Sequence, residues 1–309
     1  MHTSRLRSVW YVLGAFVLVA GIVVPAQATF HLVQIEQVIG GVGGDNTAQA
    51  IQLRSRGAGQ DFVSQGKLVA FDAAGANPVT VLDLTSNVPN GSLGDRILIC
   101  SANFTNYTSS PITPDFLMTS LIPASYLAAG SLVWENDSGT QILWRLGWGG
   151  ASYTGSNLGV TTNDGDGNFG PPFPVVLPTG GVSALLFTNS ASALSRSNIV
   201  DYVTTTGPAV FANNHTNTVA VVTDPNPRIL SIVATNSNVA ITWKLIGGKT
   251  NVVQVTGGEL VTGSYNTNGF ADLTGNIVGA GIGESITNIV DTGAANNFPA
   301  RYYRVRMTR

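Results

Sequence analysis

Two short segments near the N-terminus predict the fold of the chain: Val33-Gln34-Ile35-Glu36-Gln37-Val38-Ile39 and Ala50-Ile51-Gln52-Leu53-Arg54-Ser55. In both segments apolar and polar residues alternate, and a period of two is typical of a β-strand with one face against a core. We therefore predict half-buried strands at His31–Ile39 and Gln49–Ser55. The predicted inward residues are Val33, Ile35, Ile39, Ile51 and Leu53, and the predicted outward residues are Gln34, Glu36, Gln52 and Arg54.

The same kind of segment recurs along the chain. Most apolar segments are short, rich in β-branched or aromatic residues, and bounded by Gly, Pro, Asn, Asp or Ser, a pattern typical of strands and turns. Only Ser192–Tyr202 predicts a short helix. The strand spacing favours an all-β fold of the β-sandwich type. Further strands are predicted at Lys67–Asp72, Val79–Leu84, Arg96–Ala102, Ser131–Glu135, Gln141–Trp148, Ser183–Thr188 and Val219–Thr223.

Charge is scarce in this sequence. Charged residues make up 10% of the 309 residues, against about 25% in an ordinary soluble domain. Lys and Arg number 15 and Asp and Glu number 17, so the formal net charge is -2. This balance excludes a strongly basic nucleic-acid binder and an acidic tail protein. We therefore expect no nucleic-acid partner, while 44% hydrophobic residues suffice for a core.

Residues 1–28 have the pattern of a secretory signal. Arg5 and Arg7 precede the apolar run Val9–Val24, and Ala26-Gln27-Ala28 supplies a small-x-small cleavage pattern. We expect a secreted or cell-surface protein, with the periplasm as an alternative. A spanning helix needs about 20 apolar residues, so no permanent membrane span is expected after cleavage, and an uncleaved anchor is the alternative.

A proline-rich segment predicts the domain boundary. Asp224-Pro225-Asn226-Pro227 favours a short, stiff, extended connector. The predicted organisation is therefore one β-sandwich domain at 29–224, a linker at 225–227 and a second β-sandwich at 228–309. In the second domain, Val239–Lys244 places Trp243 on an inward face. In the last strand Tyr303, Val305 and Met307 are predicted inward, and Arg304 and Arg306 outward.

Two sets of segments resemble known families. Val33–Leu53, in which Gly40–Gly44 separates two strands, resembles the opening of bacterial lamin-tail-like domains, and Gly66–Asp72 and Leu93–Ile99 fit the same pattern. These domains are immunoglobulin-like β-sandwiches; here Gln52 stands where the family usually has Glu, and Arg54-Ser55 replaces an aromatic-Asn pair. The Trp243 strand and Tyr302–Val305 are similar to strands of fibronectin type III-like domains. The pairing resembles secreted bacterial proteins of unknown function and implies an extracellular, non-catalytic module.

The segment from Asn163 to Gly170 predicts a metal site. Oxygen-bearing side chains at Asp164, Asp166 and Asn168 alternate with glycines, like the first half of a calcium loop. Calcium takes roughly six to eight hard oxygen ligands from a bent backbone. An EF-hand is excluded because Phe169 stands where its sixth position needs Gly, and Val175 where its twelfth needs Glu. A simpler calcium loop and a turn rich in Asp and Asn are the two interpretations.

Trp134, Trp144 and Trp148 predict either a core or a ligand platform. An exposed row of indoles would stack sugar rings, whereas strand aromatics usually pack across strands, which favours the core.

The sequence offers no catalytic motif. It contains no G-x-S-x-G elbow, H-E-x-x-H site, P-loop or Rossmann fingerprint. His31 and His215 are interpreted as a strand end and a loop residue, and Cys100 as a small core residue. We therefore predict no catalytic residue and no organic cofactor.

The Arg residues near the C-terminus, Arg301, Arg304, Arg306 and Arg309, are expected to face outward on an edge strand and discourage sheet pairing, with contact to an anionic polymer as the alternative.

Three function classes follow from the sequence. The first is a secreted or cell-surface, non-catalytic binding or structural protein, stabilised by calcium if the loop binds it, with an extracellular protein or polysaccharide as partner. The second is a carbohydrate-binding accessory module that uses the tryptophans. The third is an atypical secreted hydrolase, which would require carboxylates to converge in a cleft.

Overall fold

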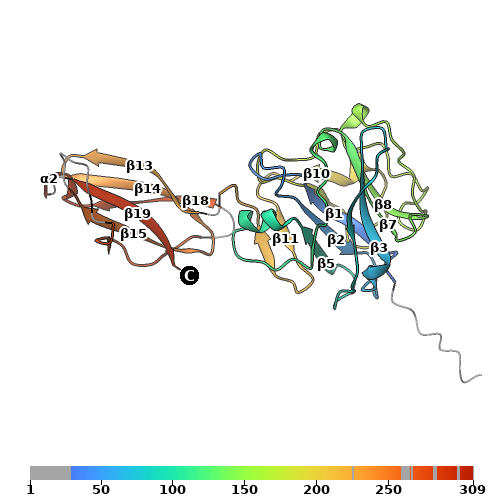
Figure 1. The fold of residues 1–309 in the computed structure, drawn as a ribbon, viewed down its shortest axis with the longest axis horizontal. Helices are drawn as coiled ribbons and strands as arrows, with labels where there is room; N and C mark the ends of the chain where they lie inside the picture. Colours follow the sequence, from blue (N-terminus) through green and yellow to red (C-terminus); the bar gives the residue numbers. More distant parts are fainter. Residues whose placement is uncertain are drawn as a thin grey trace, which may run out of the picture.

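The computed structural model describes residues 29–224, 226–258, 265, 267–280, 284–297 and 300–308. The predicted signal segment, Pro225 of the predicted linker and Arg309 lie outside the described residues. Strands dominate the described part of the chain, so the predicted all-β class is confirmed (Figure 1). In these same ranges no helix has both the length and the apolar character needed to cross a membrane.

Two sheets face each other in the part of the chain before Asp224. The first has six strands in the order β10-β9-β1-β2-β5-β6, and the second has four in the order β4-β3-β7-β8. All neighbouring pairs are antiparallel except β5 and β6. The strands of the first sheet are β1 (Val33–Ile39), β2 (Ala50–Ser55), β5 (Arg96–Cys100), β6 (Phe116–Leu117), β9 (Leu185–Phe187) and β10 (Tyr202–Thr204). Those of the second are β3 (Gly66–Phe71), β4 (Val79–Asp83), β7 (Gly130–Asn136) and β8 (Ile142–Trp148).

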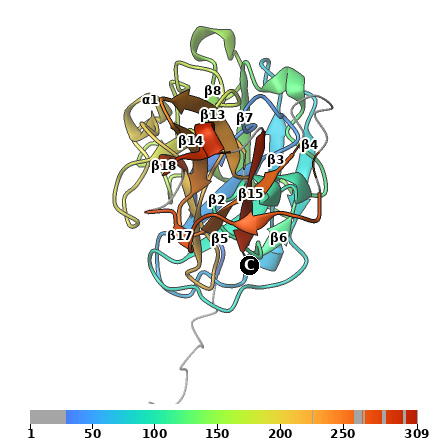
Figure 2. The same cartoon turned by 90° about the vertical axis from the view of Figure 1, so that its left-hand side faces the viewer.

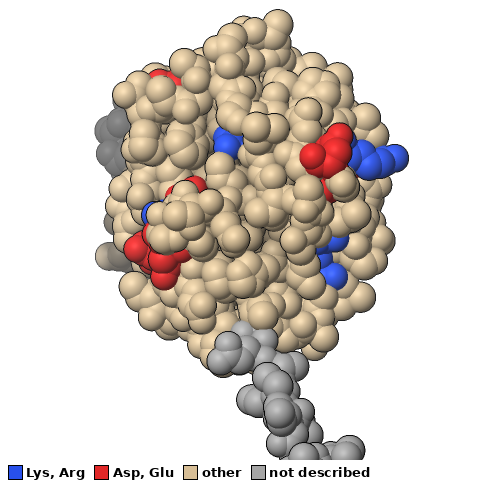
Figure 3. All heavy atoms as spheres, turned by 90° about the vertical axis from the view of Figure 1, so that its right-hand side faces the viewer, with Lys and Arg blue, Asp and Glu red and all other residues tan. Residues whose placement is uncertain are grey.

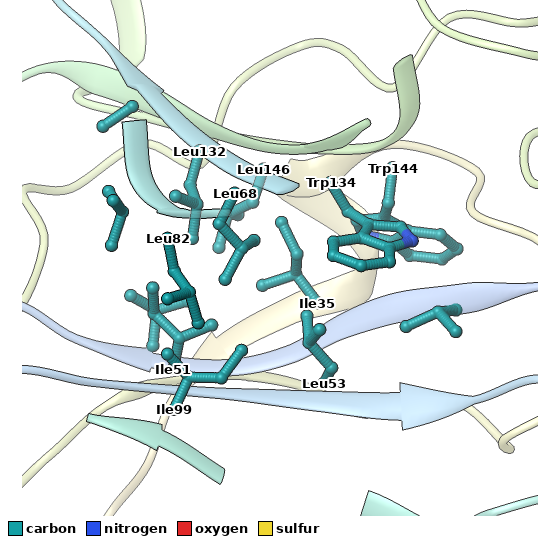
Figure 4. Packing of buried hydrophobic residues seen from close by; sticks show 14 of the residues in the cluster. Ile35, Ile51, Leu53, Leu68, Leu82, Ile99, Leu132, Trp134, Trp144 and Leu146 are labelled. Atoms are coloured by element: carbon teal, nitrogen blue, oxygen red, sulfur yellow. The ribbon is translucent and has the colours of Figure 1, made fainter. Parts of the chain in front are cut away.

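A large apolar core fills the space between these sheets. Trp134 of β7 and Trp144 of β8 lie side by side and reach toward Ile35 and Leu53 of the first sheet (Figure 4). Both indole rings are fully buried, and Trp144 makes edge contacts with Phe169 and Phe187, each with ring centroids 5.4 Å apart. Such pairs add to the free energy gained by burying their apolar area.

A hairpin covers the back of the first sheet. It consists of β11 (Val210–Ala212) and β12 (Thr218–Ala220), and it packs Phe211 and Val219 into a second apolar cluster with Leu98 and Phe104. The prediction of a half-buried strand with a solvent-facing polar side is therefore wrong for β1 and β2, because every residue of both strands is buried.

A β-bulge in β1 interrupts the side-chain alternation that the sequence predicts. The pairing with β2 shifts between Ile35 and Gln37, so Glu36 is an extra residue in this strand. After the bulge the inward side changes: Val38 lies in the core between the sheets, and Ile39 lies in the cluster under the hairpin. The prediction that Ile39 shares a face with Val33 and Ile35 is therefore wrong.

Two further sheets form the part of the chain after Asp224, on the left of Figure 1 and in front in Figure 2. One has the order β13-β14-β18, and in the other β15 pairs with β16, β17 and β19. A small core around Trp243, which is fully buried, joins them. The strands are β13 (Arg228–Thr235), β14 (Asn238–Ile246), β15 (Thr250–Gly257), β16 (Ala271–Asp272), β17 (Ile277–Val278), β18 (Glu284–Asp291) and β19 (Arg301–Thr308).

Two other local predictions need correction. The predicted helix at Ser192–Tyr202 is only the four-residue helix α1 (Asn198–Asp201), and a second short helix, α2 (Ala294–Asn297), was not predicted. In β19, Tyr303 and Val305 pack against the core as expected. Arg301, however, does not face outward, because its guanidinium lies 3.0 Å from the Asp291 carboxylate. Short 3₁₀ turns complete the fold at Val63–Gln65, Ala102–Tyr107, Ala124–Tyr126 and Gly150–Ser152.

The central indole of the first core provides a test of the packing. We predict that Trp144→Ala lowers the free energy of unfolding by about 3–5 kcal/mol, because it leaves a cavity beside Phe169 and removes the donor to the Tyr202 hydroxyl. Urea unfolding followed by circular dichroism measures the loss. The control is Leu93→Ala, since Leu93 is 54% exposed and its truncation is expected to stay within about 0.5 kcal/mol. Equal losses for the two variants would contradict this packing.

Candidate functional site

The polar residues of the first two strands meet in one buried cluster on the back of the first sheet. Its centre is the Glu36 carboxylate, which the bulge in β1 places beside the side chains of β2 and β5. Arg54 Nη1 lies 2.7 Å from Glu36 Oε1, and Arg96 donates to both oxygens, at 2.7 Å from Nε and 3.0 Å from Nη2. Gln52 Nε2 adds a fourth donor at 2.7 Å. The carboxylate is therefore saturated with hydrogen bonds.

The surroundings of Arg54 keep this cluster in place. Its Nη2 donates to the Asn189 carbonyl at 2.9 Å, and the amide oxygen of Gln34 also accepts from its guanidinium. Burial lowers the pKa of Arg54, and the negative charge of Glu36 acts in the opposite direction. The hydrogen bonds to Glu36 raise the pKa of Arg96 above its ordinary value. Glu36 is thus the counter-charge that permits two guanidinium groups beside the sheet.

A cleft of about 370 Å³ opens beside this cluster. Glu36, Gln37, Gln52 and Arg96 form its polar side. The residues that complete it come from β9, β11, β12 and the loop after β10: Leu186, Thr205, Pro208, Val210, Ala212 and Thr218. Hairpin and sheet are tied together here, because the Ala212 amide donates to Gln52 Oε1 at 2.5 Å. The cleft therefore depends on the covering hairpin as much as on the sheet.

One polar group in the cleft wall has no hydrogen-bond partner. Gln37 is only 3% exposed, and its Nε2 is buried without an acceptor. A buried unpaired donor costs about 1–3 kcal/mol, so such groups are rare in folded proteins. The Arg96 side chain, in contrast, is 42% exposed, and Glu36 accepts from only two of its nitrogens. The cleft thus has one accessible donor group, the Arg96 guanidinium, and one unpaired donor, Gln37 Nε2, buried in its wall.

The predicted calcium residues lie in one tight turn that is docked on the core. Asp164 Oδ1 accepts from the amides of Asp166 and Asn168 at 3.1 and 3.2 Å, and Asp166 Oδ1 accepts from Asn168 N at 2.9 Å. These are the bonds of a turn rich in Asp and Asn. Asp164 is 1% exposed, and its Oδ2 has no hydrogen-bond partner. In the described ranges no group of three or more His, Cys, Asp or Glu side chains is placed to hold a metal ion.

The two carboxyl groups of this turn affect each other. Burial raises the pKa of Asp164, and the neighbouring Asp166 carboxyl group raises it further. The interaction with Asp164 and the hydrogen bond from the Asn168 amide lower the pKa of Asp166. The pKa values of the two carboxyl groups are therefore shifted in opposite directions. Calcium binding at Asp164, Asp166 and Asn168 stays a prediction.

The three tryptophans belong to the core. Trp134, Trp144 and Trp148 are all fully buried, and each indole N–H has an internal acceptor: Phe30 O, Tyr202 Oη and Tyr126 O, at 3.1, 2.9 and 2.9 Å. A sugar platform requires an exposed ring face, so these residues offer none.

The remaining reactive side chains are spread over different parts of the fold. Cys100 is buried, and burial raises the pKa of its thiol to about 12, which keeps it protonated. His215 Nδ1 lies 3.9 Å from Asp115 Oδ1 at a separate hollow, and burial raises the pKa of Asp115. Glu135 lies 3.5 Å from Lys67.

Sequence reasoning missed the cleft and its principal residues, Gln37 and Arg96. A signal was present, because the polar sides of two adjacent strands carry complementary groups in register, with Gln34 opposite Arg54 and Gln37 opposite Gln52. What the sequence did not show is the cover, since Val210–Ala220 is more than a hundred residues away along the chain.

Comparison of the chain with protein-family models, with curated proteins and with solved structures finds no match.

The saturated carboxylate predicts a large effect of neutralising it. Glu36→Gln keeps the shape but leaves the buried Arg54 guanidinium without its counter-charge, so we expect a loss of about 3–5 kcal/mol of unfolding free energy. Chemical denaturation measures this loss. The matched control is Asp83→Asn on the exposed side of β4, which is expected to change stability by less than about 0.5 kcal/mol. A Glu36→Gln variant as stable as the control would show that the cluster contributes no stability.

The Asp164 carboxyl predicts a pH-dependent gain in stability. Because its pKa is raised in the folded state, its contribution to stability is complete below its ordinary value of 3.8 and is lost as the pH rises through the raised value. Asp164→Asn avoids this loss, and its amide can donate to Asp166. We expect a gain on the order of 1 kcal/mol at pH 7 that shrinks toward pH 3.5.

Thermal melts across this pH range, with calcium and with EGTA, measure the effect. Asp166→Asn, at the exposed position of the same turn, is the control and is expected to show no gain at pH 7. If calcium raises the melting temperature of the wild type but not of Asp164→Asn, the expected gain from Asp164→Asn is wrong and the calcium loop is supported.

Proposed function

We propose that this protein is a secreted or cell-surface, non-catalytic binding protein, and that it binds its ligand in the cleft beside Glu36. The observation that carries the proposal is the unpaired Gln37 Nε2 in the cleft wall. Its neighbours Glu36 and Gln52 have found partners within the protein, whereas this donor has not. A ligand that supplies an acceptor would remove the cost of leaving the donor unpaired.

The chemistry of the cleft supports binding over catalysis. A general acid or base must be free to exchange a proton with its substrate. The Glu36 carboxylate instead accepts three hydrogen bonds, two from Arg96 and one from Gln52, and forms an ion pair with Arg54. Such contacts fix the carboxylate in position, which suits the positioning of a partner.

The proposal includes the finer identity of the fold. The first pair of sheets is proposed to be a lamin-tail-like sandwich, supported by the Gly40–Gly44 loop between β1 and β2. The second is proposed to be a fibronectin type III-like sandwich, supported by Trp243 on β14 and Tyr303 on β19, which share one core. The boundary at 225–227 and the signal segment 1–28 belong to the same proposal and agree with an extracellular protein or polysaccharide as partner.

A single substitution distinguishes an effect on ligand binding from an effect on stability. We predict that Gln37→Leu weakens ligand binding about tenfold or more, because it removes the donor, while the melting temperature stays equal or rises, because it also removes the unpaired buried group. The full chain is screened on arrays of purified polysaccharides and extracellular-matrix proteins, and each hit is titrated against wild type and variant.

The control is Thr204→Val at an exposed position of β10 outside the cleft lining, which is expected to change affinity by less than about threefold. A hit whose affinity ignores Gln37→Leu would place the binding site elsewhere. A hit that is cleaved during the titration would overturn the non-catalytic assignment.

A further inference from the structure

We propose that the ligand of this cleft is a saccharide that carries a carboxylate, a uronic acid residue, and that Gln37 and Arg96 bind its carboxylate. The inference rests on the proposed function, because it concerns the ligand of the same cleft.

The hydrogen-bonding groups of the cleft select for an acceptor. The two Glu36 oxygens already accept from Arg54, Arg96 and Gln52, and the Gln52 oxygen accepts from the Ala212 amide. The polar atoms that offer something new to a ligand are donors: the buried Gln37 Nε2 and the partly exposed Arg96 guanidinium. A ligand with an acceptor group toward Gln37 and Arg96 therefore fits this side of the cleft.

The charge of the cluster selects for an anion among such acceptors. Two guanidinium groups, of Arg54 and Arg96, face the single carboxylate of Glu36, so the cluster carries one net positive charge; Arg96 and Glu36 line the cleft, and Arg54 lies behind them. The Glu36 and Arg54 side chains are largely buried, so water and salt screen the charges of this cluster less than charges at an open surface. Arg guanidinium and carboxylate match in geometry, and an amide N–H beside them adds a second point of attachment.

The strand pairing disfavours an extended peptide. Peptides commonly bind sheets by adding a strand to an open edge. The strands on the floor of the cleft are β1, between β9 and β2, and β2, between β1 and β5, so both are paired on each side. The backbone of these two strands thus offers a peptide nothing to pair with.

The remaining surfaces of the cleft suit a sugar ring. Val210 and Pro208 are exposed apolar residues at the rim, and Thr218 adds an exposed hydroxyl group. A pyranose has an apolar face and a hydroxylated edge, which match these two kinds of surface. A cleft of about 370 Å³ lies in the range typical of small-ligand sites, so it accommodates one charged ring and not a folded partner.

The test compares an acid with its ester. Full-length protein is titrated by calorimetry with oligosaccharides of galacturonic, mannuronic and glucuronic acid, and with the methyl ester of each. We expect at least one acid to bind, and we expect its methyl ester to bind at least about tenfold more weakly. Gln37→Leu and Arg96→Gln should each reduce binding of the acid about tenfold. Arg228→Gln, an exposed arginine on β13, is the control for general charge attraction and should leave affinity unchanged.

The outcomes separate this inference from the proposed function. If acid and ester bind equally well and both depend on Gln37, the ligand's carboxylate is not recognised, but the proposal that the cleft binds a ligand is retained. If a tetraglutamate peptide binds in a Gln37-dependent way and no uronate does, the proposal that the ligand is a saccharide is wrong. Binding by none of the uronates, or binding that ignores both cleft variants, would overturn the inference as a whole. Arg96→Gln keeps the test decisive if Gln37→Leu does not fold, because Arg96 lies at the partly exposed end of the cluster.

Discussion

The buried carboxylate of Glu36 is the interaction on which the first sheet depends. It joins β1 to Arg54 of β2 and to Arg96 of β5, so one side chain links three neighbouring strands on the side away from the main core. Charges taken out of water in this way are stable only when each is paired and hydrogen-bonded. Because that condition is met only with the strands in their observed register, the cluster specifies the pairing of the sheet as well as stabilising it.

The scarcity of charge in the sequence takes on a structural meaning in this arrangement. Charged side chains form only a few separate groups on the face shown in Figure 3, and the surface between them is uncharged. Several charges are used inside the fold: Glu36, Arg54, Arg145 and Asp164 are each less than a tenth exposed. With so few charges on this surface, the partly exposed Arg96 guanidinium beside the cleft is a local feature that a ligand can distinguish.

Strand positions could be predicted from the sequence, whereas the candidate site could not. Alternation and turn residues located β1, β2, β3 (Gly66–Phe71) and β8 (Ile142–Trp148), because these signals are local. The bulge at Glu36 was invisible, since an extra residue changes no composition and leaves the alternation of Val33 to Ile35 intact. It is this bulge that turns Glu36 and Gln37 toward the same side. The cover over them comes from Val210–Ala220, a long-range contact that no local pattern contains.

The same long-range cover explains why the polar residues of β1 and β2, which the sequence predicts to face solvent, are buried. A period of two predicts which side chains share a face, but not whether a face meets solvent or another element. In β1 and β2 the polar face is covered, and its side chains satisfy one another instead of water. Two buried side-chain atoms of these strands have no partner, Gln37 Nε2 and Ser55 Oγ, and of these two residues only Gln37 lines the cleft. A protein that pairs every other group around Glu36 and leaves one donor unpaired beside an open cleft sacrifices stability there, and selection tolerates such a loss most readily where it serves binding.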